Sequence, residues 1–108
     1  MPRRSMELLT ESMLYILMAL SHGPMCGVDA AQYIETISGG RLRMGPATLY
    51  TILAKFQEQK YIQEVQAQGR KRTYAITDKG RRAYEEELQR LRQCLADADL
   101  MRRDHDGE

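Results

Sequence analysis

The sequence predicts an α+β fold that is mostly α, on the strength of three observations. Four segments have the apolar content or spacing of helices. Two short runs, 61–65 and 71–76, read as strands, and Gly69 between them supplies the glycine that a tight hairpin turn requires. With 108 residues, of which 43% are hydrophobic and 29% charged, the chain has the length and composition of one globular domain.

The first predicted helix is apolar almost all round. Thr10 is expected to cap it, Met13 to Leu20 form its apolar run, and Gly23-Pro24 ends it. The run is eight residues long and is far too short to span a membrane. A helix without a polar face must be covered on both sides. In a chain of this length the second cover is hard to find within one subunit, so we expect a partner subunit to supply it.

The second and third helices flank a short connector. The second helix is expected over 27–37, and Ser38-Gly39-Gly40 stops it. Arg41 to Met44 alternates polar and apolar residues, which predicts a short half-buried strand. Gly45-Pro46 then opens the third helix, with proline at the first helical position, where its missing N–H costs nothing.

The third helix has two different faces. Leu49, Ile52, Leu53 and Phe56 fall at helical spacing and are expected to pack inward. The opposite face carries small and hydroxyl-bearing residues, so the floor of a groove could approach it closely. These outward residues are Ala47, Thr51, Ala54 and Glu58, flanked by Thr48, Tyr50 and Lys55.

A long helix is predicted from about Arg81 to Arg103, with a frayed tail over 104–108. Its apolar residues are spaced 4, 3, 4 and 3 apart, a heptad-like seam that is too short for a free-standing coiled coil. We expect the seam to form a homodimer by packing on the apolar first helix of a second subunit. The residues assigned to this contact are Leu14, Leu17, Tyr84, Leu88, Leu91, Leu95 and Ala98.

The charge of the chain is unevenly distributed. Residues 1–82 carry 12 Lys and Arg against 7 Asp and Glu, a net +5, whereas residues 83–108 carry 4 against 8, a net −4. A helix with outward hydroxyls beside a hairpin with a basic tip is the working arrangement of a winged helix-turn-helix. The sequence therefore predicts double-stranded DNA as a partner. Residues 1–80 would form the winged helix-turn-helix and 81–103 a C-terminal dimerisation helix.

The candidate DNA contacts come from the third helix, the connector before it and the hairpin. Thr48 and Thr51 are candidates for base or phosphate contact, and the Tyr50 hydroxyl is a donor for a phosphate. The alternative interpretation makes Tyr50 a partly buried core aromatic and the charges a solvated face. The full set is Arg43, Thr48, Tyr50, Thr51, Lys55, Arg70, Lys71 and Arg72.

Methionines near the expected dimer contact suggest a pocket for a small hydrophobic effector, because Met lines adaptable apolar sites. Met at helical spacing is also ordinary core, and this alternative stays open. The candidate pocket residues are Met13, Leu14, Leu17, Leu91 and Met101.

Catalysis, metal binding and cofactor binding find no support in the sequence. No nucleophile has an evident base, and no glycine-rich phosphate loop is present. His22 and Cys26 are four residues apart, but Gly23-Pro24 breaks any helix between them, so they do not form a metal site. The two cysteines lack CxxC spacing and fit a reducing cytoplasm. Cys94 is expected as a small buried hydrophobe beside the seam, with a disulfide across the dimer axis as the alternative.

Several motifs, in order along the chain, resemble the PadR family of bacterial transcriptional regulators. The resemblance covers roughly residues 8 to 92. The motifs are Leu20 to Gly27 (Leu-x-x-Gly-Pro-x-x-Gly), Ser38 to Arg41, Gly45-Pro46-Ala47-Thr48-Leu49-Tyr50, Tyr61-Ile62, Gly69 to Tyr74, and Ile76-Thr77-Asp78-Lys79-Gly80.

The resemblance implies a winged helix-turn-helix with one C-terminal dimerisation helix. It also implies a homodimer that binds a palindromic operator, usually to repress, and that a small effector releases. Two departures stand out: Cys26-Gly27-Val28 replaces a frequent His-Gly-Tyr, and the chain has no Trp, so drug sensing between Trp rings does not carry over. The competing hypotheses are a winged-helix adaptor without DNA binding and a small metalloregulator, for which no ligand set converges.

Overall fold

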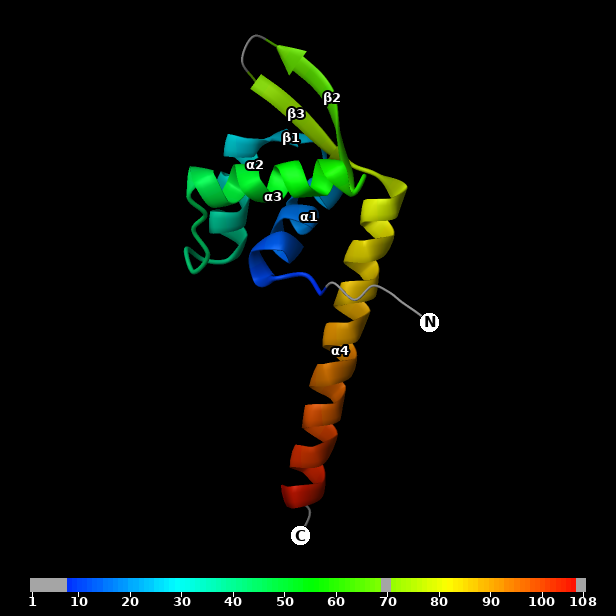
Figure 1. Cartoon of the computed structure of the whole chain (residues 1–108). Helices are drawn as coiled ribbons and strands as arrows, with labels where there is room; N and C mark the ends of the chain where they lie inside the picture. The colour runs from blue at the N-terminus through cyan, green and yellow to red at the C-terminus, as the bar shows by residue number, and fades with distance from the viewer. Residues whose placement is uncertain (1–7, 69–70, 107–108) are drawn as a thin grey trace.

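The computed structural model describes residues 8–68 and 71–106 and has the predicted α+β, mostly α, class. Three short helices form a body with a small sheet packed against it, and the last helix extends away from the body as a long arm (Figure 1). The elements are α1 (Glu11–His22), β1 (Met25–Cys26), α2 (Gly27–Ile37), α3 (Pro46–Glu58), β2 (Ile62–Gln68), β3 (Lys71–Ile76) and α4 (Asp78–Asp106).

Helix α1 forms the centre of the core. Thr10 caps it as predicted, because its Oγ1 accepts a hydrogen bond of 3.1 Å from the backbone N–H of Met13. Its apolar residues are covered by α2, β3 and α4 of the same chain. The expectation that a second subunit must cover this helix is therefore wrong, because three elements of one chain surround it. The buried residues of α1 are Met13, Leu14, Ile16, Leu17, Ala19 and Leu20.

The sheet has three antiparallel strands in the order β1-β3-β2. Strand β1 was not predicted from the sequence. It pairs Met25 with Tyr74 and Cys26 with Thr73, and two residues are too few to show an alternating pattern. Strands β2 and β3 form the expected hairpin, with a register irregularity between Glu64 and Gln66.

The predicted strand over 41–44 is absent, and the connector there has no regular secondary structure. The polar and apolar alternation nevertheless predicts burial correctly, since Leu42 and Met44 pack against the core while Arg41 and Arg43 are exposed. Alternating burial does not by itself make a strand, because a strand also requires backbone pairing with a neighbour, and residues 41–44 pair with none of β1, β2 and β3. The preceding turn uses Gly39-Gly40, both at positive φ (66° and 81°).

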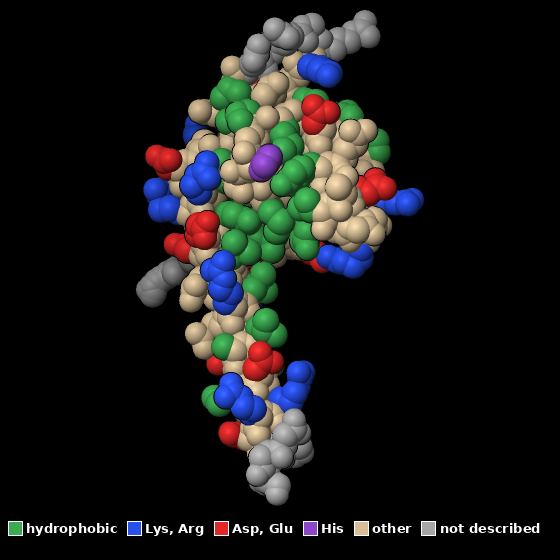
Figure 2. Space-filling view, turned by 180° about the vertical axis from the view of Figure 1, so that it is seen from behind, with side chains coloured by type: hydrophobic (Ala, Val, Ile, Leu, Met, Phe, Trp, Pro, Cys, Tyr) green, Lys and Arg blue, Asp and Glu red, His purple; other side chains and the backbone are tan. Residues whose placement is uncertain are grey.

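Helix α4 is longer than predicted at both ends, running for 29 residues from Asp78 to Asp106. Residues 104–106, expected as part of a frayed tail, are helical; 107–108 lie outside the described residues. The first part of α4 packs on the body, where Tyr84 is partly buried against the core. From Gln89 to Asp104 the helix is exposed, and apolar side chains are spaced along this arm (Figure 2). No helix among the described residues is long and apolar enough to cross a membrane.

Candidate nucleic-acid interface

The two faces of α3 differ as the sequence predicts. Its inward face is buried, with Leu49, Ile52, Leu53 and Phe56 between 0% and 9% exposed. The outward face is solvent-exposed and carries small and hydroxyl-bearing side chains that leave the helix backbone accessible. The residues exposed on or beside this face are Ala47, Thr48, Tyr50, Thr51, Ala54, Lys55 and Glu58.

Tyr50 is intermediate between the two interpretations given above. It is 48% exposed, so it is not a core aromatic, yet its ring rests on the start of α2. A Cβ added to Gly27 would lie 3.0 Å from the Tyr50 hydroxyl oxygen and 3.2 Å from two ring carbons. Gly27 therefore provides the space in which the tyrosine ring lies, and a Cβ there would require the ring to shift by a few tenths of an ångström.

A small recess joins α2, α3 and the hairpin. It holds about 110 Å³ and lies where Tyr50 meets the first turn of α2 and the start of β3. The α2 N-cap, Cys26, makes no side-chain hydrogen bond to the helix, and the N-terminus of a helix favours anions. Two cations, Lys71 and Arg72, are exposed at its rim. The lining is Cys26, Gly27, Val28, Tyr50, Lys71, Arg72 and Tyr74.

The hairpin contributes two of its three predicted cations to this region. Lys71 and Arg72 begin β3, directly after the hairpin tip. Arg70, the third, lies outside the described residues. Because Lys71 and Arg72 line the same recess as Tyr50, the structure brings together side chains that are about twenty positions apart in the sequence.

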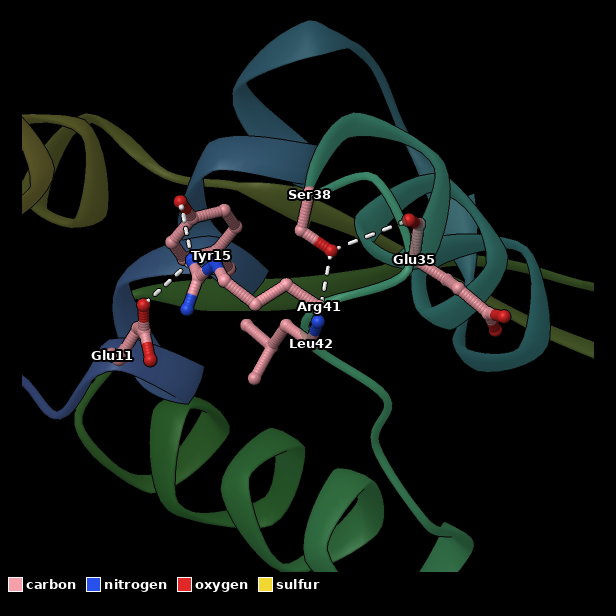
Figure 3. A network of polar contacts seen from close by, with 6 residues as sticks. All are labelled: Glu11, Tyr15, Glu35, Ser38, Arg41 and Leu42. Carbon is pink, nitrogen blue, oxygen red and sulfur yellow. Dashed lines mark hydrogen bonds and ion pairs between the residues drawn. The ribbon is translucent and has the colours of Figure 1, made fainter.

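The connector before α3 is held by two ion pairs, of which Figure 3 shows the one between Arg41 and Glu11. Arg41 Nη2 lies 2.8 Å from Glu11 Oε2 and donates a 3.3 Å hydrogen bond to the Tyr15 hydroxyl, which ties the connector to α1. The hydrogen bond with Glu11, and then its charge, raise the pKa of Arg41 above its ordinary value. Arg43, predicted to contact DNA, pairs with Glu35 at 3.3 Å and keeps 77% of its side chain exposed.

Ser38 connects this network to the end of α2. Its hydroxyl oxygen accepts a 3.0 Å hydrogen bond from the backbone N–H of Leu42 and its O–H donates to the carbonyl of Glu35. The start of α3 is thus positioned by contacts to both preceding helices. Sequence patterns did not reveal this role for Arg41, because its partners Glu11 and Tyr15 are 30 and 26 residues away.

The residues predicted for dimerisation divide into three groups, of which one, Tyr84 and Leu88 on the part of α4 nearest the body, is partly buried. Leu14 and Leu17 are 7% and 0% exposed within one chain, so Leu17 offers no surface to a partner in this conformation. Leu91 and Leu95 are 40% and 63% exposed on the arm, and Ala98 is exposed beyond them. Cys94, expected to be buried beside the seam, is exposed, and Arg90 donates to its sulfur at 3.8 Å.

The candidate effector pocket is not formed within one chain. Met13, Leu14 and Leu17 belong to the packed core, whereas Met101 is 71% exposed. Ten residues separate Leu91 from Met101, which is about 15 Å along a helix, so the five side chains do not line one cavity. The pocket was expected between two subunits, so for these residues it stays a prediction about the dimer.

One family model and several solved structures are similar to this chain. A family model described as the transcriptional regulator PadR-like family matches residues 16–86. A transcriptional regulator from Clostridium thermocellum has a similar structure, with a TM-score of 0.73, 20% identity, and coverage of 81% of this chain and 88% of that one. Bacillus subtilis PadR in complex with operator DNA has a TM-score of 0.64 and 24% identity over 72% of this chain and 46% of that one.

One further protein is similar to this chain in amino-acid sequence. The chain is 34% identical over 77 residues to an uncharacterized 37.1 kDa protein in transposon TN4556 of Streptomyces fradiae. The match covers 71% of this chain and spans only 22% of that protein. The structural likenesses are below 25% identity and show the winged helix-turn-helix fold alone, whereas the family model covers well over half of the sequence. By that match, the chain belongs to the PadR-like family of transcriptional regulators.

Proposed function

We propose that the protein is a homodimeric, sequence-specific DNA-binding regulator that acts on a palindromic operator. The recess at which α2, α3 and the hairpin meet carries this proposal. It gathers a hydroxyl, two cations and a helix N-terminus beside the exposed face of α3. Phosphate is the anion that this set suits, and a helix of small residues beside it suits the major groove.

The exposed residues take different roles in this proposal. Thr48 and Thr51 face the base edges, where short hydroxyl side chains read sequence. Tyr50, Lys71 and Arg72 hold a backbone phosphate at the recess. The remaining candidates, which would fix the position of the protein along the backbone, are Arg43, Lys55 and Arg70.

A second copy of the chain is the partner that we assign to the arm of α4. Its exposed apolar stripe consists of Leu91, Leu95 and Ala98, and a monomer gains nothing from exposing it. Two chains joined along the arms would present two α3 helices to one duplex, which is how dimeric helix-turn-helix proteins read palindromes.

Repression is the regulatory outcome that we propose, because a dimer that covers its operator blocks access to the same DNA. Release by a small hydrophobic effector is the second part of the proposal. Leu91 and Met101 are exposed on the arm, so an effector site that includes them would have to form between two subunits. A reporter gene under the selected operator, with and without candidate compounds, tests both parts.

The DNA proposal is tested by selecting bound sequences from a random pool and measuring affinity against salt. Lys71 and Arg72 are assigned to one phosphate in each subunit, so Lys71→Ala with Arg72→Ala frees two phosphates in the dimer. The double change should make log K about 1.8 less steep against log salt, at about 0.9 for each phosphate. Arg102→Ala with Arg103→Ala removes the same charge at the far end of α4 and should leave the slope unchanged. An equal change in both pairs would contradict the assignment to the recess, and a chain that selects no sequence would contradict the function.

A further inference from the structure

The turn between β3 and α4 is tied to the turn that follows α3. The backbone N–H of Thr77 donates to the carbonyl of Tyr61 at 2.9 Å. The Thr77 hydroxyl faces the carbonyl oxygens of Lys60 and Tyr61 at 2.7 and 3.0 Å, and its oxygen accepts from the backbone N–H of Gly80 at 3.0 Å. One side chain thus caps the start of α4 and joins it to the segment between α3 and β2.

Gly80 brings the two segments into direct backbone contact. It is buried in the first turn of α4, and a Cβ there would overlap the carbonyl oxygen of Tyr61. The same Cβ would lie 2.9 Å from the Tyr61 carbonyl carbon and 3.0 Å from Cγ1 of Ile76. A backbone carbonyl cannot rotate away as a side chain does, so any residue with a Cβ would force α4 to move relative to Tyr61.

Tyr61 continues the contact to α3. Its backbone N–H donates to the carbonyl of Phe56 at 2.9 Å, and the two rings pack with centroids 5.7 Å apart. From the other side, Lys79 Nζ lies 5.5 Å from the centre of the Tyr61 ring. A continuous set of contacts therefore runs from the first turn of α4, through Tyr61, to the last turn of α3.

We propose that Thr77, Gly80 and Tyr61 form a rigid joint that fixes the angle between α4 and α3, and thereby sets the distance between operator half-sites that the dimer accepts. The inference rests on the proposed function. Leu95 lies about 22 Å along α4 from Gly80, so a rotation of about 10° at the joint shifts that point by about 4 Å. This shift exceeds the rise of one base pair, about 3.4 Å.

The test uses duplexes in which the selected half-sites are moved together or apart by single base pairs. Wild-type affinity should fall by about tenfold or more per base pair from one optimum, because each step also rotates the second half-site about the duplex. Gly80→Ala should move or flatten that optimum. Its affinity for a single half-site, its salt slope and its sedimentation as a dimer should stay at wild-type values.

Three further variants make the result decisive. Thr77→Val removes the hydroxyl with less steric change and should also flatten the profile, whereas Thr77→Ser keeps the hydroxyl and should retain the wild-type profile. Gly23→Ala is the matched control, since no atom lies within 4 Å of its Cβ position.

The proposed joint would be contradicted if the affinity-against-spacing profiles of Gly80→Ala and Thr77→Val superimposed on that of the wild type and only the melting temperature fell. These residues would then act only as a cap of α4. A wild-type dimer indifferent to spacing would overturn the joint too, while leaving DNA binding intact. Failure of the proposed function is a separate result, namely no sequence selected by the wild type.

Discussion

Helix α1 and the outer part of α4 both carry apolar residues, yet the chain treats them differently. Leu17 on α1 is fully buried by neighbouring elements, whereas Leu95 on α4 is 63% exposed on an arm of a molecule 63 Å long. From the sequence, Leu17 and Leu95 were predicted to lie in the same dimer contact. Apolar spacing indicates that a face must be covered, but it does not identify which segment or subunit covers it. We infer that α1 determines the stability of the body and the arm determines association.

The largest effect should come from the core of the body. Leu17→Ala should lower the free energy of unfolding by about 2–5 kcal/mol, because it leaves a cavity in a packed region. Urea denaturation followed by circular dichroism, at a fixed protein concentration, measures this loss. Leu100→Ala, on an exposed residue of the arm, should change it by less than about 0.5 kcal/mol. Similar losses for the two variants would erase the distinction between the helices.

The second effect should be on association. Leu91→Asp with Leu95→Asp places charges on the exposed stripe and should give folded monomers by sedimentation, with affinity for the palindrome reduced by about a hundredfold. Leu88 is left intact because it is partly buried nearer the body. Leu100→Asp, which lies off the seam on the same helix, is the control. Dimers that persist in the double variant would remove the arm from the interface.

Local signals in the sequence were enough to predict most element boundaries. Thr10, Gly23-Pro24 and Gly45-Pro46 act on their immediate neighbours, and the helices begin or end where they stand. Whether β1 and the connector form strands depends on pairing with a strand far away in the sequence, and that information is not local. The strand predicted over 41–44 failed for this reason.

The candidate site was predicted in the same uneven way. Thr48, Tyr50 and Thr51 could be assigned to the surface because helical periodicity fixes the direction of a side chain. The position of the Tyr50 ring against Gly27 depends on how α2 crosses α3, which periodicity does not give. The motif from Leu20 to Gly27, which contributed to the family resemblance, does contain this glycine. It was the one signal in the sequence that could have indicated a special role for Gly27.

A third variant should affect DNA reading without changing stability or association greatly. Gly27→Ala would crowd the Tyr50 ring and force it to shift, and should weaken operator binding by up to about three- to tenfold, the scale of one lost phosphate contact. Fluorescence anisotropy with the selected duplex measures this change. Tyr50→Phe removes the hydroxyl but keeps the ring, so it measures the contribution of the hydroxyl separately from that of the ring position. If Gly27→Ala binds like the wild type, the ring position does not matter for DNA binding.

The smallest effect is expected at the ion pair between the connector and α1. Arg41→Gln removes an exposed contact and should lower the melting temperature by no more than a few degrees. Since the pKa of Arg41 is raised, its contribution is present below the ordinary value and is lost only as pH rises through the raised one. The difference between variant and wild type should therefore not change across neutral pH. A difference that varied there would implicate another group.

The stoichiometry of the DNA complex tests most directly whether two arms bring two reading helices to one site. Native mass spectrometry of the wild type with the selected palindrome, and with a single half-site, counts the chains on each duplex. We predict two chains on the palindrome and an affinity about a hundredfold higher than for the half-site. One chain on the palindrome, or equal affinity for the two duplexes, would contradict a dimeric reader.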